Sequence, residues 1–115
     1  MANTFKTITK ANVTSADIIY TVAGSTTTVL LGILLGNTTG SAITATVSLG
    51  SDTANRAGNN DEANQTVELI TGTSIPANSS LELLTGNKVV METTDTLSVT
   101  GSASTDVVLS IMEIT

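Results

Sequence analysis

Side chains that could carry out catalysis are scarce in this chain. It contains no histidine and no cysteine, whereas serine and threonine together fill 35 positions. A serine or threonine nucleophile needs a base that takes its proton, and here that base would have to be Lys6, Lys10, Lys88 or a carboxylate. Because hydroxyl groups occur in nearly every segment, none is singled out. The sequence therefore predicts that the protein is not an enzyme.

Paired carboxylates offer a second route to chemistry. Acid and base catalysis would require Glu68, Glu82 and Glu92 to converge from distant segments. We interpret all three as solvent-facing strand positions, and thiol redox chemistry is excluded because cysteine is absent. We expect no cofactor.

A cation could bind in the polar segment 50–64. Calcium accepts carboxylate and amide oxygens from one loop. This segment offers Asp52, Asn59, Asn60, Asp61 and Glu62, but their spacing does not match a calcium-binding hand. Of the two alternatives, an ion site and a plain solvated loop, we favour the loop and predict no metal site.

Two further kinds of site have weak signals. Asn-X-Ser/Thr triplets begin at Asn12, Asn37, Asn64 and Asn78, but chance supplies them in a chain this rich in threonine, and the N-terminus has no signal-peptide pattern. Sugar or base stacking needs aromatic side chains, and Phe5 and Tyr20 are the only ones present. A core position or an intersubunit contact accounts better for both.

The elements that would position these residues are β-strands. In the segment 42–49, Ile43, Ala45, Val47 and Leu49 alternate with Thr44, Thr46 and Ser48, which gives one apolar and one hydroxyl face. Similar patterns, separated by glycine and asparagine turns, predict strands over 4–9, 17–23, 27–36, 42–49, 65–70, 80–84, 88–92, 96–100 and 105–114. Residues 1–115 are expected to form one all-β domain, a single antiparallel β-sandwich of jelly-roll type with eight or nine short strands.

Two local connections can also be predicted. Gly86-Asn87 between apolar segments fits a two-residue hairpin that joins strands 80–84 and 88–92. The long polar connection 50–64 is the expected crossover between the two sheets.

The charge pattern limits the classes of partner. The net charge is −6, and the bases Lys6, Lys10, Arg56 and Lys88 are scattered, so we expect neither nucleic acid nor an anionic membrane as partner. The longest apolar stretch, 29–35, is far shorter than a membrane helix of about 20 residues.

Two predicted strands are apolar on both faces. In 27–36 and 105–114 the alternation with threonine fails, which indicates that a partner covers the second face. Self-association is the commonest solution for such a surface, and docking on a larger assembly is the next. The candidate interface residues are Val29, Leu31, Ile33, Leu35, Val108, Met112 and Ile114.

Several segments carry a resemblance to a known group. They are the opening 1–6, Tyr20-Thr21-Val22, Leu31-Gly32-Ile33 with 36–44, Ile75–Leu81, Gly86–Glu92 followed by Asp95, and Ser110–Ile114. In these segments the chain resembles small virion proteins of tailed phages, particularly phages of marine bacteria and cyanobacteria. The segment 50–64 departs from that pattern.

The resemblance implies a structural component of the virion, with the major capsid protein or other virion proteins as partners. A capsid cement or decoration protein, assembled through strand edges and apolar faces as a homo-oligomer, is the leading hypothesis. A neck, tail or fibre-attachment component is the alternative, and a module that binds host glycans is a more distant one.

Overall fold

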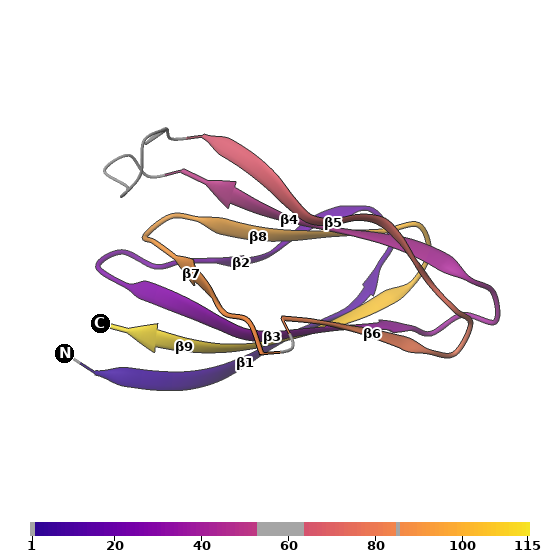
Figure 1. Cartoon of the computed structure of the whole chain (residues 1–115), viewed down its shortest axis with the longest axis horizontal. Coiled ribbons are helices and arrows are strands. Elements are labelled where there is room, and N and C mark those ends of the chain that lie inside the picture. Colours follow the sequence, from indigo (N-terminus) through magenta and orange to yellow (C-terminus); the bar gives the residue numbers. More distant parts are fainter. Residues whose placement is uncertain (1, 53–63, 85) are drawn as a thin grey trace.

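The structure is a computed structural model that describes residues 2–52, 64–84 and 86–115. In this part of the chain, nine strands form two antiparallel sheets (Figure 1). Sheet A contains, in spatial order, β1 (Asn3–Val13), β9 (Thr105–Ile114), β3 (Thr27–Asn37), and then β6 (Ser80–Leu83) and β7 (Val89–Met91) along one edge. Sheet B contains β2 (Ala16–Thr21), β8 (Thr96–Gly101), β4 (Ile43–Ser51) and β5 (Gln65–Ile75). The predicted all-β sandwich is confirmed.

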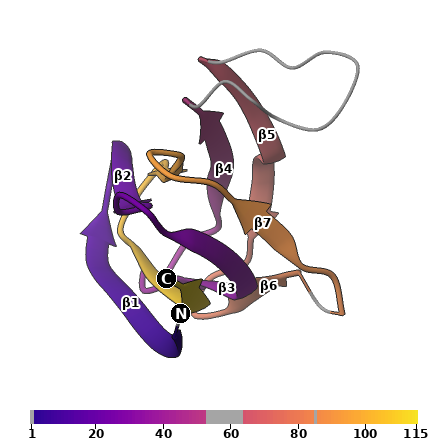
Figure 2. The ribbon, with the colours of Figure 1, turned by 90° about the vertical axis from the view of Figure 1, so that its left-hand side faces the viewer.

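The strands pair in a nested order. β1 pairs with β9, β2 with β8, β3 with β6 and β7, and β4 with β5. Successive pairs alternate between the sheets, so the chain resembles one long hairpin that has been rolled up. This is jelly-roll connectivity, and the end view in Figure 2 shows the two layers.

The core lies between the sheets and follows from the alternation. In β4, Ile43, Ala45 and Val47 are buried, whereas Thr44 is exposed. Leu97 and Val99 of β8 complete the sheet B side, and Leu30, Val107, Leu109 and Ile111 lie opposite them in sheet A. Each such aliphatic side chain contributes about 1.5–3 kcal/mol relative to an exposed position.

The predicted Gly86-Asn87 hairpin does not form. β6 pairs with residues 33–36 of β3, and β7 pairs with residues 28–30, so both lie along the same edge of β3 and not beside each other. This arrangement buries Met91 and half-buries Leu81 and Leu83 against the core. Between them the chain turns at Leu84 and Gly86, whose φ values are 63° and 76°.

The prediction for the 50–64 connection is also wrong. β4 and β5 are antiparallel neighbours in sheet B, so the connection does not cross between sheets. β5 also continues beyond the predicted end of its strand at residue 70, as far as Ile75. Gly72 has φ +55°, its N–H donates to the Thr46 hydroxyl at 2.9 Å, and the register against β4 shifts there, so the strand continues through a bulge.

The edges of both sheets carry features that hinder pairing with another chain. The long edge strand β1 directs Lys6 and Lys10 to the inner side, since they pair across from Ile111 and Val107. Edge strand β2 has only 6 residues, β5 contains register shifts, and the opposite edge of sheet A is split into β6 and β7. Free edges are therefore poor candidates for assembly.

Gly101 is expected to tolerate no side chain. A Cβ atom there would lie 2.7 Å from the carbonyl oxygen of Val13 and 2.9 Å from that of Ala103. Because both oxygens belong to the backbone, Gly101→Ala should lower the free energy of unfolding by about 1–3 kcal/mol. Urea denaturation measures this loss. Gly40→Ala is the control, because a Cβ there meets nothing within 4 Å, and equal stability of the two variants would contradict the close approach.

Candidate functional site

The seven residues predicted as an interface divide into two groups. Five lie on the outer side of sheet A and are half-buried: Val29, Leu31, Val108, Met112 and Ile114. The other two, Ile33 and Leu35, point into the core and are 2% and 0% exposed. Their assignment to the interface is wrong.

A β-bulge in β3 is the reason. The register against β9 shifts between Leu30 and Gly32, so Leu31 is an extra residue without a partner across the strand pair. Leu30 and Ile33 both face inward although they are three residues apart, because the bulge reverses the alternation. Leu34 takes the outward position instead and is 37% exposed.

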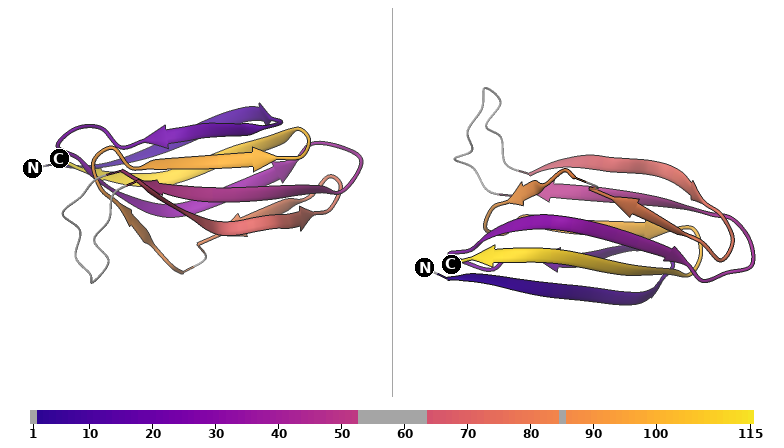
Figure 3. Two further views of the ribbon diagram at one scale, coloured as in Figure 1. Left: turned by 90° about the horizontal axis from the view of Figure 1, so that it is seen from above. Right: turned by 60° about the horizontal axis from the view of Figure 1, so that its bottom comes forward.

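The outward residues form apolar rows across the strands. Phe5 of β1 lies opposite Met112 of β9, Met112 opposite Val29 of β3, and Val29 opposite Val90 of β7. Phe5 is 71% exposed and Val90 59% exposed. In the right panel of Figure 3, β1, β9 and β3 lie side by side.

A second, shorter row joins Val108 to Leu34. We call the whole surface the apolar face, and it comprises Phe5, Val29, Leu31, Leu34, Val90, Val108, Met112 and Ile114. Leu34 and Val90 were not among the predicted interface residues, and for Phe5 an intersubunit contact was one of two predicted alternatives, the other being the core. The pattern that could have revealed Val90 is the alternation Val89-Val90-Met91, in which the first and last residues face the core.

An open hollow of about 360 Å³ lies on the apolar face near the second row. Gly32 contributes to it, and a Cβ atom at that position would meet nothing within 4 Å. The residues that line it are Leu31, Gly32, Ile33, Leu34, Glu82, Leu83, Leu84, Gly86, Val108 and Ser110. The face therefore combines an exposed aromatic ring with an apolar depression.

The outer side of sheet B differs in kind. Its strands present hydroxyl groups there, among them Thr44, Thr46, Ser48, Ser98 and Thr100. A surface of hydroxyl groups stays hydrated, whereas a contiguous apolar surface marks an interaction site. The apolar face is thus the candidate functional site.

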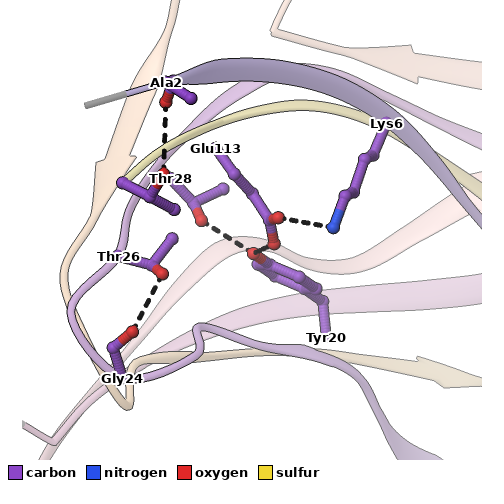
Figure 4. A network of polar contacts seen from close by, with 8 residues as sticks. Ala2, Lys6, Tyr20, Gly24, Thr26, Thr28 and Glu113 are labelled. Carbon is purple, nitrogen blue, oxygen red and sulfur yellow. Dashed lines mark hydrogen bonds and ion pairs between the residues drawn. The ribbon is translucent and has the colours of Figure 1, made fainter.

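A polar cluster joins the two sheets near the chain termini (Figure 4). Tyr20 of β2 donates its hydroxyl proton to Glu113 Oε2 of β9 at 2.6 Å and lies 2.7 Å from the Thr28 hydroxyl of β3. Lys6 Nζ lies 2.7 Å from Glu113 Oε1. Burial and the bond to Glu113 raise the pKa of Tyr20 to about 12, and the bonds from Lys6 and Tyr20 lower the pKa of Glu113.

The cluster is poorly arranged for general base catalysis. The Glu113 carboxylate already accepts from Lys6 and Tyr20, and the Thr28 hydroxyl beside Tyr20 is 0% exposed. A second ion pair, between Lys10 and Asp17 at 3.7 Å, joins β1 of sheet A to β2 of sheet B. We interpret the Tyr20–Glu113 hydrogen bond and the Lys10–Asp17 ion pair as contacts that join the two sheets.

The other residues considered for chemistry do not converge. Glu68 and Glu82 are exposed on different sheets, and Lys88 is exposed in the turn between β6 and β7. Among the described residues, no three or more acidic, histidine or cysteine side chains lie together in a group that could hold a metal ion. Asp52 donates its backbone N–H to Asp95, and the remaining predicted cation ligands, Asn59 to Glu62, lie outside the described residues.

The glycosylation triplets have different environments. Asn37 is 4% exposed, and its Nδ2 donates to the carbonyl oxygens of Ser41, Ile75 and Pro76. This side chain joins two loops and is not accessible to a modifying enzyme. Asn12, Asn64 and Asn78 are exposed.

A search of the described residues for a helix with the length and hydrophobicity of a membrane span finds none.

Comparisons with known proteins do not assign the chain to a family. No family model matches the chain, and no curated protein matches it. A chain from the structure of Bacillus endospore appendages, described as disulfide-linked pili, aligns with 99% of this chain and 87% of its own length at 18% identity and a TM-score of 0.47. A chain of the T13 IBDV viral particle aligns with 96% of this chain and 35% of its own length at 12% identity and a TM-score of 0.35. We draw no functional conclusion from likenesses at this level.

The Tyr20–Glu113 cluster predicts a pH dependence of stability. The pKa of Glu113 is lowered by folding, so its contribution is present above the ordinary glutamate pKa of 4.5 and is lost as pH falls below it. The pKa of Tyr20 is raised from 10.0, so its contribution is present below pH 10 and is lost as pH rises toward 12. Denaturant unfolding should show Glu113→Gln flattening the acid limb and Tyr20→Phe flattening the alkaline limb. Unchanged limbs in the two variants would contradict the cluster.

Substitutions should separate the two sides of sheet A. Phe5→Ser and Val90→Ser remove exposed side chains, so each should change the free energy of unfolding of the isolated chain by no more than about 0.5 kcal/mol. Leu109→Ala opens a cavity in the core and should cost about 2–5 kcal/mol. A large loss in the two serine variants would mean that the apolar face supports the fold of the single chain.

Proposed function

We propose that this chain is a structural protein of a bacteriophage virion, a cement or decoration protein that stabilises the capsid through protein contacts, and that it acts without catalysis or a cofactor. The apolar face carries the proposal. A surface with a 71% exposed phenylalanine and a 59% exposed valine in one row is stabilised when a partner protein removes it from water.

The architecture supports this role. Jelly rolls recur in viral capsid proteins and also in lectins, although a fold by itself does not define a function. The resemblance of the segments Ile75–Leu81 and Gly86–Glu92 to phage virion proteins points toward the first of these groups. Rigidity and repeated contact surfaces are what a cement protein requires.

A neck, tail or fibre-attachment component uses the same kind of surface, and the copy number in the particle separates the two positions. A glycan-binding module is less well supported, because sugars stack on aromatic rings and Phe5 is the one exposed aromatic side chain. Phe5 also lies in a row of aliphatic residues and not among polar groups that could bind hydroxyls.

Electron microscopy of the phage particle that carries this chain tests the proposal directly. We expect hundreds of copies at junctions between capsid subunits, with the apolar face covered by protein. Six or twelve copies would indicate the neck or tail. Absence from purified particles would overturn the proposal.

A reconstitution experiment gives the matching prediction. Particles that lack the protein should lose their genome at a lower temperature than complete particles, and purified protein should restore the higher temperature. The double variant Phe5→Ser, Val90→Ser should fail to restore it, because both changes lie on the apolar face. Ile18→Ser, an equally exposed apolar position at 60% on sheet B, is the matched control and should restore it fully. Equal restoration by both variants would exclude the apolar face.

A further inference from the structure

The apolar face has the extent of a dimer interface. Its long strands β1, β9 and β3 have 11, 10 and 11 residues, and β6 and β7 together occupy the position of a fourth strand. At about 3.3 Å per residue and about 4.8 Å between strands, the sheet measures roughly 33 by 19 Å, or about 600 Å² before side-chain relief is counted. A stable interface buries about 800 Å² of accessible surface per partner, so one covering protein uses essentially the whole face.

Electrostatics permits a second copy of the chain as that protein. The net charge of −6 makes two copies repel wherever charged surfaces meet. On the outer side of the described strands of sheet A, the charged residues are Glu82 on β6, which lies beside Leu34 and lines the hollow, and Asp106 at the start of β9. The first row contains no charged residue, so two copies can approach closely there.

The relief of the face is also self-complementary. Phe5 projects from the first row, and the hollow beside Gly32 lies on the same face. Consider a twofold axis that lies in the plane of contact, midway between two points of the face and perpendicular to the line that joins them. This axis places the first point of each copy against the second point of the other copy. One such axis therefore places the Phe5 ring of each copy in the hollow of the other, and both contacts form at once.

From these observations we infer that two copies of this chain pack through their apolar faces, with Phe5 of each copy inserted into the hollow over Gly32 of the other. The inference rests on the proposed function in taking the apolar face as a contact surface, and it specifies the partner.

Sedimentation velocity of the purified chain, from about 1 to about 500 µM, tests this inference. We expect a monomer–dimer equilibrium. Phe5→Ser should raise the dissociation constant at least about 10-fold, because it removes the aromatic side chain that inserts into the hollow. Gly32→Leu should raise it similarly by filling the hollow, since a Cβ there meets no neighbour within the same chain.

Matched controls use the same substitutions elsewhere. Ile18→Ser on sheet B and Gly40→Leu in the loop after β3 should leave the dissociation constant within about 2-fold, since neither lies on the apolar face. Circular dichroism melts check that all variants are folded. A monomer at every concentration, or a dimer that Phe5→Ser and Gly32→Leu leave unchanged, would overturn the inference.

Failure of the dimer and failure of the proposed function are distinguishable. A monomer in solution that is found in particles with its apolar face against another virion protein removes the dimer and keeps the virion role. A dimer that is absent from particles keeps the self-association and removes the virion role.

Discussion

Strand β9 is apolar on both sides, and its place between β1 and β3 determines the two surfaces of sheet A. Val107, Leu109 and Ile111 on its inner side close the core, while Val108, Met112 and Ile114 on its outer side leave apolar atoms in contact with water. Because the first and last strands pair with each other, the core closes only when the most distant parts of the chain meet. Contacts of such long range are expected to make folding slow.

The strands were largely predictable from the sequence, since alternation between core and solvent is a local signal. The partners of the strands were less so. Gly86-Asn87 has the composition of a tight hairpin, but Leu81, Leu83 and Met91 reach the core when both flanking strands pair with β3, and burial outweighs the turn preference. The local sequence of these two strands does not indicate that the edge of β3 is long enough for both of them to pair with it.

The candidate interface was predicted in part for a related reason. Strict period two places Val29, Leu31, Ile33 and Leu35 on one face, but a bulge at Leu31 moves the last two into the core. A bulge in a continuously apolar segment cannot be detected from the hydrophobicity of the residues. With or without the bulge, aliphatic residues lie on both sides of the strand. The extra residue of that bulge belongs to β3 and not to β9, so the period-two alternation holds along β9.

The protected edges and the exposed face have different consequences for the size of an assembly. A free strand edge can recruit a further strand that offers a new edge, so growth along an edge has no natural end. A face that one partner covers can bind no further partner, so the assembly stops growing at a fixed number of copies. On β1, Lys6 and Lys10 point inward while Phe5 points outward, so sheet A offers a partner its face and not its edge, and association through that face saturates at a fixed number of copies.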